Sequence, residues 1–232
     1  MKKDPLIKID FIKTPTAQIS NIKDLQKYHL QIKPFIEERE NHFADIFKNA
    51  GHKEIFAELA FCLFTPQSKA VSCWAAVNEL ADKAMLFNST AKEIANVITK
   101  VRFRNNKSKY LVSARDMLVN NAKTNIKDFL SSFNDIYELR AWLIKNIKGI
   151  AYKEASHFLR NIGIGKNLAI LDRHILKNLK ILGAIKDIPK SLTAQEYLDI
   201  EKQMQNFSKK IKIPMSHLDM LLWCKESGGI FK

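Results

Sequence analysis

Lys153 and Asp172 are the two residues of this chain whose side chains have the clearest potential for chemistry. They lie nineteen positions apart, in the stretches Ile147-Lys148-Gly149-Ile150-Ala151-Tyr152-Lys153 and Leu171-Asp172-Arg173-His174-Ile175. An uncharged lysine amine is a nucleophile, and a carboxylate beside it can stabilise positive charge and move protons. The pair therefore predicts attack on an electron-poor carbon such as that of a sugar.

The turn around Gly149 has the features of a phosphate-binding site. Glycine permits backbone angles that are closed to other residues, and the small Ala151 lets the next helix start close to a phosphate. A helix beginning near Tyr152 adds unpaired N–H groups and a positive dipole end, and Lys145 and Lys148 add charge. An ordinary helical corner, with the glycine as a simple C-cap, is the alternative.

The helix after this turn must position the amine. Its apolar residues share one face, which we expect to be buried: Ala155, Phe158, Leu159 and Ile162. Lys153 then lies near the helix start and faces a cleft, where desolvation, nearby lysines and the positive helix end favour an uncharged amine. Asp172 begins the next helical pattern, so it can act as an N-cap as well as a catalytic group.

The charge of the chain points to a polyanionic partner. Its 232 residues carry 38 Lys and Arg against 24 Asp and Glu, a net charge of +14. Nucleic acid is the leading candidate, followed by an acidic membrane surface, and a lysine-rich surface without a specific partner is the alternative. The sequence contains no signal-length apolar stretch and no membrane span, so we expect an intracellular, cytoplasmic protein.

The three cysteines do not form a motif. Cys62, Cys73 and Cys224 are widely spaced and include no Cys-x-x-Cys pair, so the sequence predicts neither a disulfide framework nor a zinc or iron–sulfur site. We interpret them as buried or inert thiols. No metal site is predicted.

The remaining pattern predicts a mainly α protein. Gly and Pro are few, at 7 and 6, and apolar residues recur at three- and four-residue spacing. Ile7–Ile12 alternates and predicts an edge strand or part of an extended arm over 1–20. We expect one unit over 1–232 made of two helical lobes with a cleft between them. The expected helices cover 22–33, 35–48, 52–64, 68–83, 91–100, 107–122, 125–132, 135–146, 152–163, 172–181, 193–208 and 215–226.

The two stretches around Lys153 and Asp172 resemble the helix–hairpin–helix DNA glycosylases, whose pattern is Leu-Pro-Gly-Val-Gly, a lysine two residues on, and Val-Asp-x-His downstream. Here the hairpin occupies about 135–163. Lys153–Gly163 and Asp219–Lys225 are similar to the type-2 8-oxoguanine DNA glycosylases/lyases of archaea and thermophiles. Lys148 replaces the family's proline and Ala151 its second glycine. The four-cysteine cluster of endonuclease III is absent, which fits the type-2 branch.

The resemblance implies a two-step reaction on DNA. Lys153 displaces the damaged base from C1′ with assistance from Asp172, and the resulting Schiff base permits β-elimination of the 3′ phosphate. No metal or organic cofactor is implied, although backbone carbonyls of the hairpin can recruit a monovalent cation. The implied partner is double-stranded DNA containing oxidised guanine, and we expect a monomer associated with the nucleoid.

The resemblance also assigns residues that contact DNA and the base. In the DNA-binding set, Gln67 fills the place of the flipped nucleotide, or is an exposed residue starting a helix. Lys148, Gly149, Ala151, Arg173 and His174 complete this set, although His174 could also cap a helix or pack. The base pocket comprises Phe103, Asp219, Trp223 and Lys232. Packing of Phe103 and Trp223 in the core, with a fraying C-terminus, is the alternative.

Two other functions remain open from the sequence. One is a glycosylase of the same scaffold that removes a different base, which release assays over several lesions would distinguish. The other is a non-catalytic helix–hairpin–helix protein that only binds DNA. The presence of both Lys153 and Asp172 counts against the second function.

Overall fold

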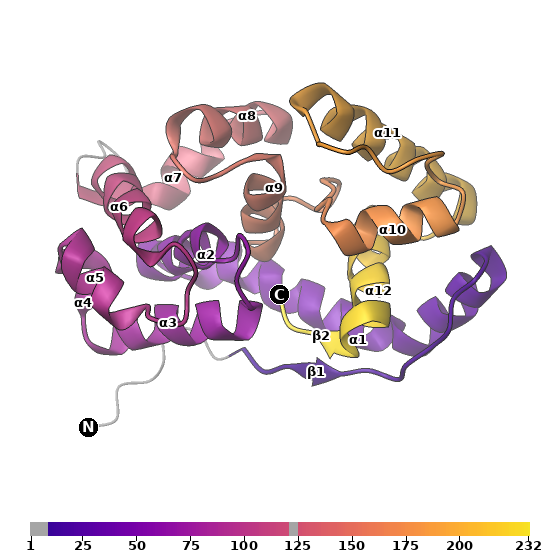
Figure 1. Ribbon diagram of the computed structural model, residues 1–232, viewed down its shortest axis with the longest axis horizontal. Helices are drawn as coiled ribbons and strands as arrows, with labels where there is room; N and C mark the ends of the chain where they lie inside the picture. The colour runs from indigo at the N-terminus through magenta and orange to yellow at the C-terminus, as the bar shows by residue number, and fades with distance from the viewer. Residues whose placement is uncertain (1–8, 121–124) are drawn as a thin grey trace. The chain divides into compact units, whose positions relative to one another are not determined.

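The computed structural model describes residues 9–120 and 125–232, and helices dominate it, as the sequence predicts (Figure 1). The chain divides into two compact units. Unit 1 contains Ile9 and Ala44–Ile164, whereas unit 2 contains Asp10–Phe43 and Gly165–Lys232. The long helix α1 (Ile22–Asn49) supplies residues to both units.

Unit 1 is built from short helices around one buried helix. In chain order the elements of unit 1 after α1 are α2 (His52–Phe64), α3 (Ala70–Asp82), α4 (Met85–Asn88), α5 (Ala91–Val97), α6 (Arg104–Arg115), a π-helix (Asp116–Asn120), α7 (Ile126–Ser131), α8 (Ile136–Asn146) and α9 (Tyr152–Asn161). The central helix is α2, which contacts α3, α6, α7 and α9.

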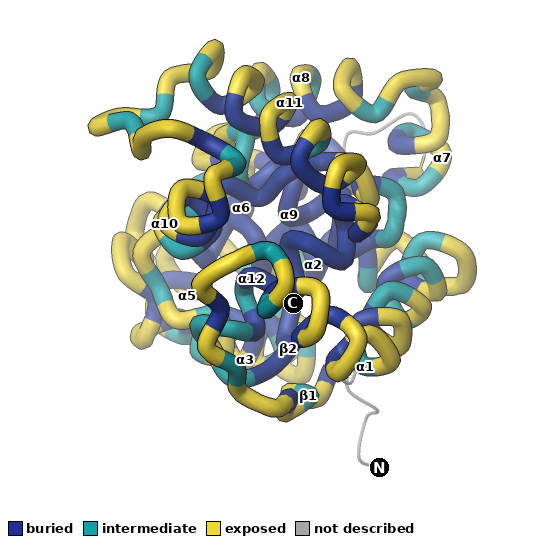
Figure 2. The backbone as a smooth tube through the Cα atoms, turned by 90° about the vertical axis from the view of Figure 1, so that its right-hand side faces the viewer, coloured by how far each residue is buried: buried dark blue, intermediate teal, exposed yellow. Residues whose placement is uncertain are grey.

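The burial of α2 follows from its composition. Every residue of Ile55–Phe64 is buried, and α2 appears dark blue in Figure 2. A helix that is apolar on all sides is stable only inside a core. Its one buried acid, Glu58, accepts a hydrogen bond from Asn161 Nδ2 of α9 at 3.1 Å. This bond fixes the end of α9 against the core of unit 1.

Helices α8 and α9 form the predicted hairpin, and the predicted face of α9 is buried. Ala155, Phe158, Leu159 and Ile162 are each 0% exposed, which confirms the prediction. The two helices are also joined by Arg140 of α8, which is 1% exposed. Its guanidinium donates to Ser156 Oγ at 3.0 Å and lies 5.1 Å from the ring centre of Tyr152.

Gly149 closes the turn between these helices. Its φ of +87° is in the left-handed region, which glycine adopts without steric cost. A Cβ atom at this position would lie 2.4 Å from Cδ2 of Tyr110 in α6. Two independent constraints, the backbone angle and the aromatic ring, therefore require glycine here.

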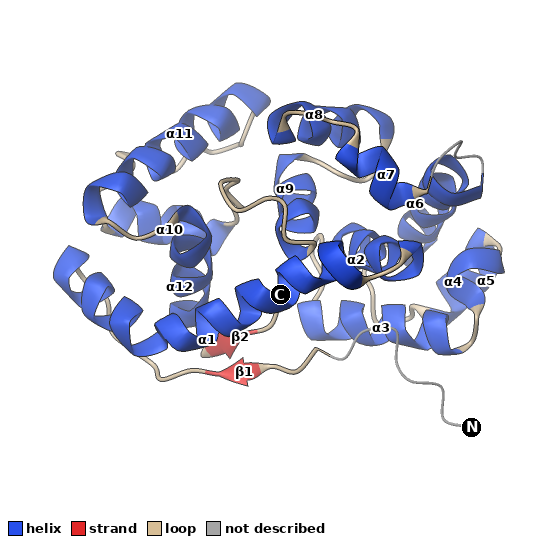
Figure 3. Ribbon diagram, turned by 180° about the vertical axis from the view of Figure 1, so that it is seen from behind, coloured by secondary structure: helices blue, strands red, loops and turns tan. Residues whose placement is uncertain are grey.

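Unit 2 is organised around α12 (Met215–Ser227). It contacts α10 (Arg173–Ile181), α11 (Ala194–Ile211) and β2 (Gly229–Ile230), and its residues Met215–Leu222 are all buried. β1 (Ile12–Lys13) pairs with β2 in antiparallel register, with Ile12 opposite Ile230 (Figure 3). The first part of α1 completes this unit.

The predicted break near Pro34 is wrong, because α1 continues through it. A proline inside a helix costs about 3 kcal/mol through the lost hydrogen bond and a clash with the preceding turn. Pro34 lies on the exposed side of α1, where water can solvate the freed carbonyl. The opposite side is anchored by Leu25, Ile32 and Ile36, all 0% exposed.

Other boundaries also differ from the expected ones. The strand expected at Ile7–Ile12 is shorter and begins at Ile12, with residues 7 and 8 outside the described part of the chain. The helix expected over 107–122 starts at Arg104 and changes to a π-helix at Asp116. The short α4 was not expected.

Two further features of the described residues are the burial of the cysteines and the hydropathy of the helices. Cys62, Cys73 and Cys224 are buried thiols, as predicted, and burial raises the pKa of Cys73 to about 11. Over residues 9–120 and 125–232, no helix combines the length and the apolarity needed to cross a bilayer.

We predict that Gly149→Ala lowers the free energy of unfolding by about 3 kcal/mol, because backbone strain and the clash with Tyr110 add. Gly183→Ala is the matched control, since Gly183 also has a positive φ, +69°, but no atom within 4 Å of the added Cβ. It should cost about 1 kcal/mol. Urea unfolding followed by circular dichroism measures both, and equal losses would contradict the role of Tyr110.

Candidate active site

The proposed nucleophile, Lys153, lies in the first turn of α9 in unit 1. Its side chain is 25% exposed, and its Nζ lies 3.7 Å from Oε1 of Glu154. The other oxygen of Glu154 accepts a hydrogen bond from the backbone N of Ala151 at 3.4 Å. One carboxylate therefore holds the start of α9 and lies beside the amine.

Glu154 was missed in the sequence analysis, although a signal for it exists. It is the third residue of α9, a position where an acidic side chain often bonds back to the N-cap amide. Its side chain is only 12% exposed, so it contributes a partly buried negative charge next to Lys153.

The turn itself presents backbone at the surface. Lys148, Gly149 and Ala151 are exposed, whereas Ile147 and Ile150 are buried on the inner side of the turn. The first amides of α9 follow directly. These amides lack partners within the helix, so an outward-facing turn of this kind can bind an anion.

Gln67 lies in a turn between α2 and α3 that is held by a buried lysine. Lys107 of α6 is 4% exposed. Its Nζ donates to the carbonyl oxygens of Phe64 and Pro66 at 2.7 and 2.6 Å. It also donates to Oγ of Ser68 at 3.3 Å. Gln67, between these acceptors, is exposed and has a φ of +57°, so it precedes α3 and does not start it.

Lys107 also links this turn electrostatically to Lys153. Burial lowers the pKa of Lys107, and the positive charges of Lys153 and Arg102 lower it further, whereas Cys73 and Glu154 act in the opposite direction. Lys107 was missed in the sequence analysis. A lysine in register with the buried Leu111 and Ala114 of α6 is the signal that indicates a buried, paired ammonium.

Phe103, like Gln67, is exposed and has a left-handed backbone conformation. Its φ is +58° and it is 56% exposed, so it does not fill the core. The backbone N of Arg102 donates to Ser68 Oγ at 3.0 Å, which joins the Phe103 turn to the Gln67 turn. Left-handed backbone at non-glycine residues costs free energy and is concentrated at functional sites.

In unit 2, Asp172 is the N-cap of α10. Its Oδ1 accepts hydrogen bonds from the backbone N atoms of His174 and Ile175, at 2.8 and 2.9 Å. The two amides share one oxygen, so the cap does not require Oδ2. The structure thus supports the N-cap role and leaves one carboxylate oxygen that the cap does not use.

Arg173 and His174 follow this cap. Nε of Arg173 donates to Nε2 of His174 at 3.1 Å, so the imidazole proton lies on Nδ1, which faces Oε2 of Glu226 at 3.4 Å. The ring of His174 packs edge-on against Trp223, with centres 5.6 Å apart. His174 therefore supports Trp223, whereas Arg173 is exposed.

A network of hydrogen bonds joins α10 and α12, the helices that carry His174 and Trp223. Asn178 donates to Glu226 Oε1 at 3.0 Å, and this hydrogen bond holds the pKa of Glu226 below its ordinary value, with Lys177, Lys225 and His174 contributing. Lys225 in turn donates to Asn178 Oδ1 at 2.6 Å. Since these residues come from α10 and α12, the network fixes the two helices that carry His174 and Trp223.

The remaining predicted base-pocket residues, Asp219, Trp223 and Lys232, belong to unit 2 and lie in α12 or after it. Trp223 is partly exposed, so it is not a core residue. Asp219, one turn before it on α12, is 5% exposed. Lys232, after β2, is 7% exposed, so this residue packs against the protein.

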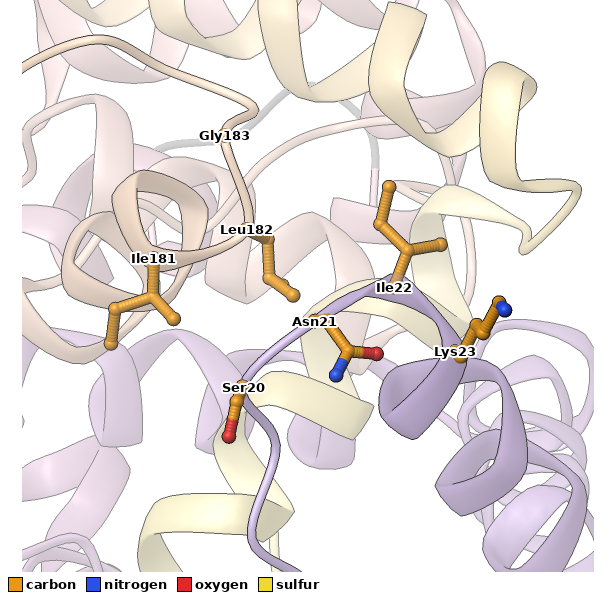
Figure 4. A pocket seen from close by; sticks show the side chains of 7 residues that line it. All are labelled: Ser20, Asn21, Ile22, Lys23, Ile181, Leu182 and Gly183. Atoms are coloured by element: carbon orange, nitrogen blue, oxygen red, sulfur yellow. The ribbon is translucent and has the colours of Figure 1, made fainter.

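In the part of the chain that the structure describes, neither a metal-binding cluster nor the surface hollow of unit 2 adds residues to the predicted site. Within the described ranges, no group of three or more His, Cys, Asp or Glu side chains is arranged to hold a metal ion. A surface hollow of unit 2 contains none of the predicted site residues (Figure 4). It is lined by Ser20, Asn21, Ile22, Lys23, Ile181, Leu182 and Gly183.

Known proteins share the sequence over most of the chain. A relative from Fusobacterium nucleatum, described as an 8-oxoguanine DNA glycosylase/AP lyase, is 46% identical over 90% of this chain and 96% of its own length. A relative from Methanocaldococcus jannaschii with the same description is 35% identical over 92% of this chain and 99% of its own length.

Solved structures agree with these relatives. The crystal structure of the M. jannaschii 8-oxoguanine glycosylase/lyase in complex with a 15mer DNA containing 8-oxoguanine has a TM-score of 0.81 at 34% identity. It covers 91% of this chain and 99% of that one. The 8-oxoguanine DNA glycosylase of Thermotoga maritima gives 0.80 at 29% identity, covering 91% and 98%.

The family model described as 8-oxoguanine DNA glycosylase matches residues 36–213, which include the Gly149 turn, Lys153 and Asp172. This match and the relatives confirm the resemblance found in the sequence. The chain therefore belongs to the 8-oxoguanine DNA glycosylase family.

Proposed function

We propose that this protein excises 8-oxoguanine from DNA and then cleaves the abasic strand by β-elimination. The observation that carries the proposal is the position of Lys153, a partly buried amine in the first turn of α9 directly after the exposed turn at Gly149. A family match over residues 36–213 supports the same reaction.

The first step replaces the base by the amine. Nζ of Lys153 forms a bond to C1′ while the bond from C1′ to N9 of the base breaks, and the base leaves with the electron pair and takes up a proton. Positive charge develops on the sugar during this step. We assign its stabilisation to the carboxylate of Asp172, whose cap hydrogen bonds use only Oδ1.

The second step cuts the strand. The nitrogen lone pair of Lys153 forms a double bond to C1′ as the C1′–O4′ bond breaks, O4′ keeps the bonding pair and takes up a proton, and the open-chain sugar is left as a protonated imine. This imine withdraws electrons, so a proton on C2′ is lost and the bond from C3′ to its phosphate oxygen breaks. The imine is the species that borohydride reduces to a permanent cross-link.

Recognition of the oxidised base requires a hydrogen-bond acceptor, because oxidation at C8 converts N7 from an acceptor to an N–H donor. We assign this recognition to buried residues of unit 2, with the carboxylate of Asp219 as the candidate acceptor and Lys232 as a further residue of the pocket. Trp223 and Phe103 provide partly exposed aromatic faces for stacking.

We assign the DNA backbone to the exposed turn at Lys148, Gly149 and Ala151, with Arg173 as a further phosphate contact. Exposed Gln67 is proposed to fill the space left by the extruded nucleotide. A monovalent cation bound by hairpin carbonyls, a monomeric state and association with the nucleoid remain proposals from the family resemblance.

One experiment tests the whole proposal. Duplexes with an end label and a single lesion are incubated with the protein, with and without borohydride, and base release, nicking and cross-linking are measured together. Release of 8-oxoguanine with a borohydride-dependent cross-link is expected. DNA binding without either product would identify a binding protein, and release of a different base alone would identify another glycosylase.

We predict that Lys153→Gln keeps the fold and much of the DNA binding but abolishes both base release and borohydride trapping, because the nucleophile is removed. Lys148→Gln is the matched control, since Lys148 is exposed in the same turn. It should still be trapped, with weaker and less salt-dependent DNA binding. Trapping of Lys153→Gln at the normal rate would locate the nucleophile elsewhere.

Asp172→Asn separates the two roles of this residue. Asparagine is as good an N-cap as aspartate, so the unfolding free energy should change by less than about 0.5 kcal/mol. The negative charge is lost, so we predict that excision slows by about 100-fold. Single-turnover assays beside urea unfolding measure both quantities, and unchanged excision would restrict Asp172 to a cap.

Extension of the chain beyond Lys232 tests the buried tail. A short segment added after Lys232 displaces this buried residue and should weaken excision of 8-oxoguanine, while β-elimination at a preformed abasic site continues. The two rates are compared on otherwise identical duplexes. Equal rates before and after the extension would remove the tail from base recognition.

A further inference from the structure

We propose that the segment Asp10–Pro15, the N-terminal arm, is a positioning element for base recognition. It holds the C-terminal residues Phe231 and Lys232 in place and so controls excision without contacting DNA itself. The inference rests on the proposed function, which assigns Lys232 to the base pocket.

The arm is joined to the tail by backbone pairing. β1 and β2 are antiparallel, with Ile12 opposite Ile230 and Lys13 opposite Gly229 (Figure 3). The backbone N of Thr14 donates to the carbonyl of Gly228 at 3.2 Å, which extends the pairing beyond the two strands. In an antiparallel ladder, hydrogen-bonded residue pairs alternate with pairs that are not hydrogen-bonded. Because Thr14 and Gly228 form a hydrogen-bonded pair, Ile12 and Ile230, two residues further along, form the next one.

An isolated pair of two-residue strands is marginally stable, so the arm needs its own anchor. Helix α1 of the same unit provides it. Nη2 of Arg39 donates to the carbonyl of Asp10 at 2.6 Å, and the hydroxyl of Tyr28 donates to the carbonyl of Pro15 at 2.8 Å. Arg39 and Tyr28 are 4% and 1% exposed, so both ends of the arm are fixed to buried side chains.

The contact between arm and tail is close at Gly229. A Cβ atom there would lie 2.4 Å from the carbonyl oxygen of Ile12 and 2.5 Å from the ring of Phe11. Because this oxygen belongs to the backbone of the arm, it can move away from Gly229 only if the arm itself moves. Glycine at this position therefore permits the approach of the two strands.

The residues at and after β2 are buried. Ile230, Phe231 and Lys232 are only 2, 8 and 7% exposed. The tail leaves α12 through Gly228, which has a φ of +73° and no atom within 4 Å of an added Cβ. Beyond that open turn the arm is paired directly with Gly229 and Ile230, so the arm restrains the residues from which Phe231 and Lys232 continue.

The test alters the pairing from each side. Gly229→Ala acts from the tail by pushing the arm away, and Ile12→Pro acts from the arm by removing a donor of the ladder. Lys13→Ala is the matched control, because Lys13 is exposed and its substitution leaves the backbone pairing intact. All three variants are made in the full-length chain.

Two readouts are combined. The first is the rate at which carboxypeptidase B releases Lys232, which should rise at least about tenfold in Gly229→Ala and Ile12→Pro because the tail opens more often. The second is the ratio of 8-oxoguanine excision to β-elimination at a preformed abasic site. This ratio should fall about tenfold or more in the same variants and stay unchanged in Lys13→Ala.

The outcomes are distinct. Faster release with an unchanged ratio would overturn the role of the arm in recognition, and unchanged release would overturn its role in holding the tail. Parallel loss of both enzymatic steps would indicate a general structural effect and would also overturn the proposal. Absence of excision and trapping in the unaltered protein would instead refute the proposed function, since the protease readout does not depend on activity.

Discussion

The close approach of the Gly149 turn to the ring of Tyr110 is the constraint on which the site of unit 1 depends. A φ of +87° turns the chain sharply after α8, and the ring, 2.4 Å from where a Cβ would lie, leaves no room for a side chain. The direction of α9 is thereby fixed. Lys153 follows within one turn of that helix, so a backbone constraint determines where the amine lies.

Buried polar side chains extend this fixed geometry to the surface residues. Lys107 donates hydrogen bonds to two carbonyl oxygens of the Gln67 turn, and Ser68 joins that turn to the turn that presents Phe103. Both presented residues have left-handed backbone, whose cost of about 1–3 kcal/mol each is met by these internal bonds. Rigid presentation suits the role proposed for Gln67, which is to fill the space of an extruded nucleotide in a stacked duplex.

Local patterns predicted the hairpin, whereas distant contacts decided what the sequence analysis missed. The buried face of α9 follows from helical spacing alone. Pro34 was misread because the burial that keeps α1 continuous comes from tertiary packing. Lys107 was missed because its acceptors are backbone carbonyls 43 and 41 positions away. The arm was predicted, but its pairing was not, because its partner Ile230 is distant in the sequence.

If Lys153 forms the bond to the sugar, the position of that bond in the trapped complex identifies it. The borohydride-reduced complex with a lesion-containing duplex is digested, and the peptide that carries the nucleotide remnant is sequenced by mass spectrometry. We expect the remnant on the ε-nitrogen of Lys153. A remnant on another lysine, such as Lys148 or Lys107, or on the α-amino group, would contradict it.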